Sequence, residues 1–275
     1  MNKHTFAALT LAGFGLAFAL PGHAGSIAVD GNFSDWGISN NGTAAGWKPT
    51  SGIFYTVEDQ DNSNSGYLSP GWGGQAYDAE ALYATWSTHA NGQTYLDIAL
   101  ITGHDPSTVT NGSTSFGRGD FAIDFGRDGS WDYGILTADR STTLHQGDVV
   151  ATTNADWAKG LWTAPGVYDP AHSQYITAVK TGTDVGDAAL AISTVFTNMG
   201  VLGGNHWFYE LEIPVTAFGQ HWTSSGPTEA FTLEWTMLCS NDIITLDPSR
   251  VPEPATAALL LGALGVLGAA RRQRR

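Results

Sequence analysis

The sequence predicts an all-β fold, a two-sheet antiparallel β-sandwich. Several segments alternate polar and apolar residues at a period of two and are rich in β-branched and aromatic side chains. Gly, Ser, Thr and Asn are abundant between these segments, and they are turn-forming residues. Extended periodicity of 3.6 residues, the pattern of amphipathic helices, is absent. Many short strands joined by turns are typical of a sandwich.

The N-terminal residues 1–24 have the pattern of a signal peptide helix. Lys3 precedes an apolar run over residues 6–20, and Pro21-Gly22-His23-Ala24 supplies small residues after it. We therefore expect signal peptidase to cleave between Ala24 and Gly25. An N-terminal membrane anchor is the alternative, although the apolar run is short for a membrane span.

The C-terminal residues 251–275 have the pattern of a membrane-inserted tail. A helix over the apolar residues 255–270 would be about 24 Å long, slightly less than a hydrocarbon core of about 30 Å. The arginines after it are expected to stay on the cytoplasmic side. This predicts transient insertion into the inner membrane, with a simple tail anchor as the alternative. The residues that define the pattern are Pro252, Glu253, Pro254, Arg271, Arg272, Arg274 and Arg275.

A Pro-Glu-Pro motif, a short apolar helix and a basic tip, in this order, resemble the PEP-CTERM sorting signal of Gram-negative bacteria. The resemblance implies that an exosortase recognises and processes the tail. It also implies export through the inner membrane to the cell surface or an exopolysaccharide matrix. The hydrophobic sorting helix would then be absent from the mature protein.

Residues 25–250 are expected to form one domain between the two signals. Removing Lys3, the four terminal arginines and Glu253 from the 12 basic and 26 acidic residues leaves 7 basic and 25 acidic, a net charge of about −18. Such a charge disfavours nucleic acid and anionic lipid as partners and is compatible with divalent cations or neutral glycans. Cys239 is the single cysteine, so no internal disulfide forms, and a buried thiol is expected.

The strands are predicted from the alternating pattern and from turn signals. A first strand is expected at residues 26–29. Asn91-Gly92 predicts a hairpin between residues 81–88 and 94–100, and Gly126–Gly129 predicts another between residues 120–125 and 130–136. Pro214 suits the first position of a helical turn over residues 214–218. Further strands are predicted at residues 188–196, 206–213 and 231–238, and long loops at residues 39–46, 59–74 and 154–173.

Three blocks resemble the family-9 carbohydrate-binding module and the related DOMON sandwiches. They are VDGNFSDW at residues 29–36, the block at residues 119–133, and HWFYELEIPVTAFG at residues 206–219. The resemblance implies a jelly-roll or DOMON-like sandwich. Residues 231–244 resemble the final strand of many PEP-CTERM surface proteins, but Ser240 stands where glycine is usual. That departure brings the turn after this strand into question.

Four aspartates at regular spacing form a candidate calcium site: Asp120, Asp124, Asp128 and Asp132. On a strand the first two face the same way, while the third lies in the predicted turn. Calcium takes six to eight oxygen ligands, so clustered carboxylates would suit it. The alternative is that these aspartates are solvated and cap turns. The spacing differs from that of an EF-hand loop.

Four tryptophans lie in loop-like stretches and are candidate glycan contacts: Trp47, Trp72, Trp157 and Trp162. Sugar rings stack on aromatic faces while nearby polar groups bind their hydroxyls. Anchoring of the loops is the alternative role. Trp86, Trp207 and Trp235 lie within strand patterns and are expected in the core.

The sequence favours a noncatalytic protein that binds glycan or exopolysaccharide. A purely structural or adhesive surface protein is the second hypothesis, and a secreted glycan hydrolase is the third. The nucleophile-elbow, zinc-protease and phosphate-loop motifs are absent, and the histidines are scattered. Some DOMON relatives hold haem through Met and His, which makes Met199 and Met237 minor candidates, with core packing as the simpler role.

Overall fold

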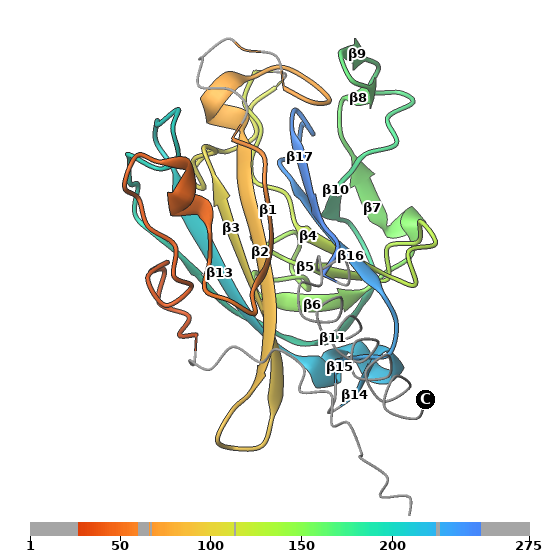
Figure 1. Cartoon of the computed structure of the whole chain (residues 1–275). Helices are drawn as coiled ribbons and strands as arrows, with labels where there is room; N and C mark the ends of the chain where they lie inside the picture. The colour runs from red at the N-terminus through yellow and green to blue at the C-terminus, as the bar shows by residue number, and fades with distance from the viewer. Residues whose placement is uncertain (1–26, 60–65, 67, 113, 224–225, 249–275) are drawn as a thin grey trace, which may run out of the picture.

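The computed structural model describes residues 27–59, 66, 68–112, 114–223 and 226–248. Two antiparallel sheets dominate this part of the chain (Figure 1). The first sheet has the order β1-β2-β3-β13-β12, with bounds Phe54–Val57, Ala79–Thr88, Thr94–Thr102, Trp207–Pro214 and Ala189–Ile192. The second sheet has the order β11-β6-β5-β4-β16-β17, with bounds Thr183–Asp187, Asp148–Ala151, Tyr133–Ile135, Phe121–Phe125, Phe231–Thr236 and Ile243–Leu246.

Short elements surround the two sheets. Three two-stranded ribbons pair β7 (Trp157–Lys159) with β10 (Ile176–Val179), β8 (Trp162–Ala164) with β9 (Val167–Tyr168), and β14 (Trp222–Thr223) with β15 (Gly226–Pro227). The 3-10 helices are η1 (Ala44–Trp47), η2 (Gly74–Tyr77), η3 (Asn154–Asp156) and η4 (Val215–His221). No helix within the described ranges is long and apolar enough to cross a membrane. The predicted signal peptide and sorting helices lie outside those ranges.

One hydrophobic core lies between the two sheets. Leu82 and Ile98 of the first sheet belong to the same buried cluster as Ile123 and Leu233 of the second. Successive side chains of a strand point to opposite faces, so each strand contributes every second residue to this core. The two sheets therefore pack face to face, and the predicted all-β sandwich is confirmed.

The N-terminal segment covers the outer face of the first sheet. Trp36 lies over Tyr83 and Phe208, with ring centroids 6.3 Å apart in both pairs. Glu210 fixes the segment by accepting hydrogen bonds from Trp36 Nε1 at 2.7 Å and from the backbone N–H groups of Asp30 and Gly31 at 2.9 and 3.0 Å. Because both faces of the sheet are covered, its inner strands β2, β3 and β13 are buried over most of their length.

The outer face of the second sheet is also covered. The ring of Trp157, on the ribbon of β7 and β10, packs in one cluster with Val150, Ile176 and Val179. Gly134 permits close approach of this cover, since a Cβ atom there would lie 2.3 Å from Val179 Cγ2.

The predicted hairpins are confirmed by the strand pairing. β2 and β3 pair from Thr88 and Thr94, and Gly92 adopts a φ of 80° in the turn between them. β4 pairs with β5, with Ile123 opposite Tyr133. η4 confirms the helical turn after Pro214. The later strands β12, β13 and β16 lie within or close to their predicted ranges.

Two predictions of local structure were wrong. No strand is present at residues 27–29, because Ala28 N–H donates to the Asp35 carboxylate at 2.8 Å instead of to another strand. Residues 154–173 are not one long loop, since they hold η3, β7, β8 and β9. Strands of two or three residues are too short to show an alternating pattern.

The turn after β16 forms without glycine: Ser240 adopts a φ of 53°, and its N–H donates to the Met237 carbonyl at 2.8 Å.

Candidate functional site

Three segments that are distant in the sequence meet at one end of the sandwich, which we call the loop end. They are η2 before β2, residues 103–108 after β3, and residues 204–207 at the start of β13. Thr102 is the strand partner of both Ala79 and Trp207, so the three segments leave the first sheet at the same end of its strands. In Figure 1 this end is at the top.

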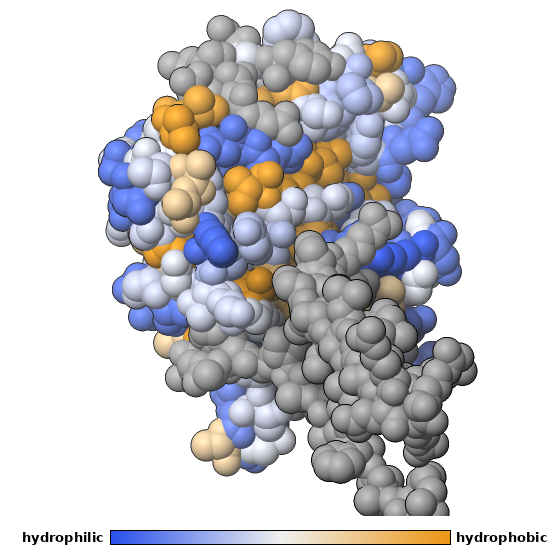
Figure 2. Space-filling model, in the orientation of Figure 1, coloured by the Kyte–Doolittle hydropathy of each residue, from blue (hydrophilic) through white to orange (hydrophobic). Residues whose placement is uncertain are grey.

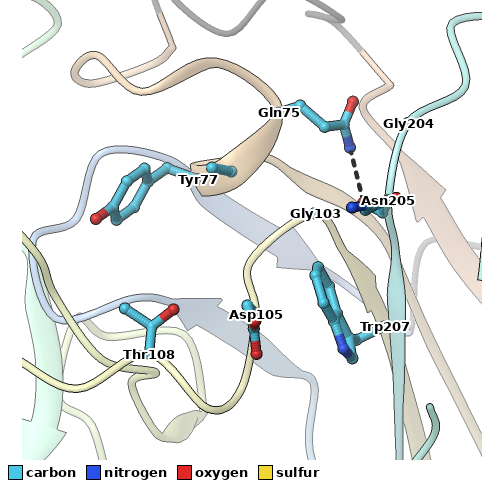
Figure 3. Close-up of a pocket in the computed structure, with 9 residues that line it drawn as sticks. Gln75, Tyr77, Gly103, Asp105, Thr108, Gly204, Asn205 and Trp207 are labelled. Atoms are coloured by element: carbon cyan, nitrogen blue, oxygen red, sulfur yellow. Dashed lines mark hydrogen bonds between the residues drawn. The ribbon is translucent and has the colours of Figure 1, made fainter. Parts of the chain in front are cut away.

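The three segments enclose a pocket with a volume of about 420 Å³. Its lining combines two aromatic rings with amide, hydroxyl and carboxylate groups. Figure 3 shows Tyr77 and Trp207 on either side of Asp105, with Thr108 beside it. The lining residues are Gln75, Ala76, Tyr77, Gly103, Asp105, Thr108, Gly204, Asn205 and Trp207.

Two glycines allow the three segments to pack closely against Gln75. A Cβ atom on Gly103 would lie 1.8 Å from the Gln75 carbonyl oxygen. A Cβ atom on Gly204, whose φ is 111°, would lie 2.7 Å from Gln75 Cδ. Larger residues at either position would therefore push the walls of the pocket apart.

A buried polar network holds Gln75 in place. Its Nε2 atom donates to Glu80 Oε1 at 2.5 Å and to the Asn205 carbonyl at 3.4 Å, the bond drawn in Figure 3. His206 Nε2 donates to the same Glu80 oxygen at 3.0 Å. Glu80 and His206 are both buried. The network connects η2 to residues 204–207 through Glu80 of β2, beneath the pocket, and so fixes these two walls.

Tyr77 is supported by a neutral histidine. The rings of Tyr77 and His104 are 5.6 Å apart. Burial lowers the pKa of His104, and its Nε2–H donates to the Phe116 carbonyl at 2.8 Å. On the same side of the pocket, Asp105 Oδ1 accepts hydrogen bonds from the N–H and hydroxyl of Ser107 at 2.8 and 2.7 Å. These contacts fix an aromatic face and a carboxylate next to each other.

Sequence reasoning missed most of this pocket. Trp207 was expected in the core but is only half-buried, because it is the first residue of β13 and lies at the mouth of the sandwich. Trp235 lies in the core as expected. Trp86 was also expected there, but it is half-buried and packs against the core cluster from outside. The signal available in the sequence was the position of Trp207 two residues after the glycine-rich residues 203–205.

Three of the four loop tryptophans are buried anchors. The indole Nε1 atoms of Trp47, Trp157 and Trp162 donate to Asp59 Oδ2, Thr152 Oγ1 and Asn241 Oδ1 at 2.9, 3.2 and 3.0 Å. Trp47 covers the first sheet and Trp157 the second, so the structure does not bring these two together. Trp72 differs, since 54% of its surface is exposed.

The aspartates of the candidate calcium site have protein partners. Asp120 is buried and accepts from Arg140 Nε and Nη2 at 2.9 and 2.6 Å, from Thr137 N–H at 2.9 Å and from Val179 N–H at 2.9 Å. Asp124 accepts from the N–H groups of Asp128 and Gly129 at 3.2 and 2.9 Å.

The other two aspartates stabilise the same turn. Asp128 accepts from Ser130 N–H at 2.8 Å, and Asp132 accepts from Phe125 N–H at 2.7 Å. Within the part of the chain that the structure describes, no group of three or more His, Cys, Asp or Glu side chains is arranged to hold a metal ion. The contacts of Asp124, Asp128 and Asp132 match the turn-capping alternative, whereas Asp120 is buried in an ion pair with Arg140. Calcium binding here stays a prediction.

The sulfur-containing side chains of the domain are in the core. Met199 and Met237 are buried in separate hydrophobic clusters. Cys239 is a free, buried thiol as predicted, and burial raises its pKa to about 12. A thiol with this pKa is inert as a nucleophile at neutral pH.

Comparison with known proteins identifies the C-terminal segment. Residues 250–275 match the PEP-CTERM protein-sorting motif. An exosortase recognises this motif, which marks an exported protein of the Gram-negative cell surface. No curated protein and no solved structure matches the chain. The resemblance of residues 29–36, 119–133 and 206–219 to the family-9 carbohydrate-binding module is thus not confirmed.

Proposed function

We propose that this exported protein is a noncatalytic glycan-binding protein and that the pocket at the loop end takes a sugar unit of an exopolysaccharide. The observation behind the proposal is the combination of Tyr77 and Trp207 with Asp105, Asn205 and Thr108 around one pocket. Aromatic faces receive the apolar C–H face of a sugar, while amide, hydroxyl and carboxylate groups bind its hydroxyls.

The charge of the protein favours a neutral glycan. Among the described residues that line the pocket none is basic, and Asp105 is the one that carries a charge. An acidic polysaccharide would be repelled by this carboxylate and by the acidic surface of the domain. A neutral sugar can instead donate its hydroxyl protons to the carboxylate.

The same lining supports a noncatalytic role. Glycoside hydrolysis commonly needs two carboxyl groups on opposite sides of the scissile bond. Asp105 is the single carboxylate among the lining residues, and the nearby Glu80 is buried beneath Gln75 and His206. Binding without cleavage is the activity that this arrangement favours.

The proposal is tested by retention of the processed protein on exopolysaccharide from the producing bacterium. We expect Trp207→Ala to weaken binding about tenfold, as for one aromatic anchor at the centre of a recognition surface. The matched control is Trp131→Ala, which removes another half-buried tryptophan at the β4–β5 turn, away from the loop end. Equal retention of wild type and Trp207→Ala would contradict the pocket as the site.

The same experiment, repeated with calcium and then with a chelator, tests the metal prediction. Binding that is lost with the chelator would support a calcium-dependent site. No retention of the wild type in either condition would favour a structural or adhesive surface protein. The buried, hydrogen-bonded rings of Trp47, Trp157 and Trp162 are the observation that favours this second candidate.

A further inference from the structure

Two exposed aromatic side chains lie at the loop end outside the pocket. Trp72 is 54% exposed and Tyr168, at the end of β9, is 60% exposed. Figure 2 shows hydrophobic residues among hydrophilic ones at the upper end of the molecule, which is the loop end in this orientation. Isolated exposed apolar residues are common on protein surfaces, but these two are held by shared contacts.

Trp162 connects the two exposed residues from below. Its buried ring packs edge-on against Tyr168, with centroids 5.8 Å apart and planes at 84°. On its other side the ring contacts Gly71, where a Cβ atom would lie 2.2 Å from Trp162 Cε2. Gly71 is the residue before Trp72, so one buried ring contacts both Tyr168 and the backbone that carries Trp72.

Hydrogen bonds hold the same three parts together. Trp162 Nε1 donates to Asn241 Oδ1 at 3.0 Å, and Asn241 Nδ2 donates to the Trp72 carbonyl. The backbone N–H of Gly166, in the β8–β9 turn, donates to the Pro70 carbonyl. Trp72 and Tyr168 therefore lie on two loops that hydrogen bonds connect. We call the surface formed by these two side chains the aromatic platform.

The aromatic platform is continuous with the pocket. Two residues, Gly73 and Gly74, separate Trp72 from Gln75, so the Cα atoms of Trp72 and Gln75 are at most about 11 Å apart. The intervening Gly73 packs on the pocket wall, because a Cβ atom there would lie 2.6 Å from Tyr77 Cβ. The platform therefore borders the pocket through residues 72–75.

We propose that the aromatic platform is a second sugar-binding site and that the ligand is an extended neutral polysaccharide chain. The inference rests on the proposed function of the pocket. One sugar unit of the polysaccharide would occupy the pocket, and Trp72 and Tyr168 would stack on units further along the same polysaccharide chain. Trp162 positions both rings without touching the ligand.

The test compares two probes: the exopolysaccharide of the producing bacterium and disaccharide fragments of it. Binding of each probe to the processed protein is measured for wild type, Trp72→Ala, Tyr168→Ala and Trp72→Phe. We expect Trp72→Ala and Tyr168→Ala each to weaken binding of the polymer by about tenfold and to leave binding of the disaccharide unchanged. Trp72→Phe keeps an aromatic face and should retain most of the affinity. Tyr55→Ala, which removes an exposed tyrosine of β1, is the matched control.

The outcomes separate the two proposals. If Trp207→Ala weakens binding of both probes while Trp72→Ala and Tyr168→Ala weaken neither, the second site is wrong and the pocket stands. An equal loss for polymer and disaccharide in Trp72→Ala would also overturn the second site, because Trp72 would then belong to the pocket. Absence of binding of both probes to the wild type would overturn the pocket and the platform together.

Discussion

At the scale of single residues, the most unusual groups are buried carboxylates. Asp97 is 1% exposed on the covered face of the first sheet, with Glu212 as its strand partner and one hydrogen bond from Ser87 Oγ at 3.3 Å. Burial, together with the charge of Glu212, raises the pKa of Asp97 to about 8. Burial also raises the pKa of Glu210 and that of Asp242 to about 7.

These raised pKa values predict that the domain loses stability as the pH increases. A carboxyl group whose pKa is higher in the folded than in the unfolded state stabilises the fold below its unfolded pKa of about 4, and this contribution is lost as the pH rises through the folded pKa of about 8. We expect the melting temperature to fall progressively between about pH 5 and 8, where the carboxyl group is ionised in the unfolded chain but protonated in the folded one, and to level off above pH 8. Asp97→Asn should raise the melting temperature at pH 9 by about 5 °C, corresponding to about 2 kcal/mol.

The control for this measurement is Asp187→Asn, which changes an exposed aspartate on β11 and should leave the pH profile unaltered. A wild-type melting temperature that stays constant or increases from about pH 5 to 8 would contradict the prediction.

At the scale of elements, Asp120 connects β4 and β5 of the second sheet with β10 of the ribbon that covers it. It lies directly before β4, and it binds the backbone after β5 at Thr137, the backbone of β10 at Val179, and the Arg140 guanidinium. Removing one partner of a buried ion pair costs about 3–5 kcal/mol. We expect Asp120→Ala to lower the free energy of unfolding by about this amount, with or without calcium, in urea denaturation.

Asp128→Ala, which changes an exposed turn residue, is the matched variant and should cost less than about 1 kcal/mol. If the loss in Asp120→Ala appears only when calcium is present, the carboxylate acts as a metal ligand and the interpretation as a structural ion pair fails.

Elements formed by neighbouring residues were predictable from the sequence, whereas elements formed by distant ones were not. The β2–β3 hairpin depends on Asn91-Gly92 and on alternation within its own strands, and it was predicted correctly. The ribbon of β8 and β9 exists because Trp162 is held by Asn241, 79 positions away, and no local pattern indicated it. Residues 27–29 have a strand pattern but form no strand, and Ile27 packs against the outer face of the first sheet.

The candidate site was hidden for the same reason. Gln75, Asp105 and Asn205 are ordinary loop residues in the sequence, and only the order of β2, β3 and β13 brings them together. Of the four tryptophans expected in loops, Trp157 and Trp162 begin β7 and β8 and Trp47 ends η1, so the loop assignment holds for Trp72 alone among them. Whether such a ring faces solvent or the interior depends on a distant hydrogen-bond acceptor, which the sequence does not reveal.

At the scale of the whole molecule, the sorting motif at residues 250–275 determines where the domain is displayed. We expect deletion of residues 251–275 to release the protein into the medium, measured as the ratio of cell-associated to free protein in fractions from the producing bacterium. Deletion of residues 255–270 alone, with the terminal arginines retained, distinguishes loss of the apolar segment from loss of charge. Unchanged cell association after the larger deletion would contradict the role of the tail.

The direction of β17 has a mechanical consequence for a protein attached through its tail. β17 starts beside the loop end, where Asp242 pairs with Pro70, and runs away from it. Asp247 lies near the opposite end, since it pairs with Arg127 of the β4–β5 turn at 3.4 Å. A pull between an attached C-terminus and a ligand at the loop end would act along the axis of β17, which is also the axis of its antiparallel partner β16. The hydrogen bonds between the two strands would then be loaded in shear and share the force, instead of opening one after another.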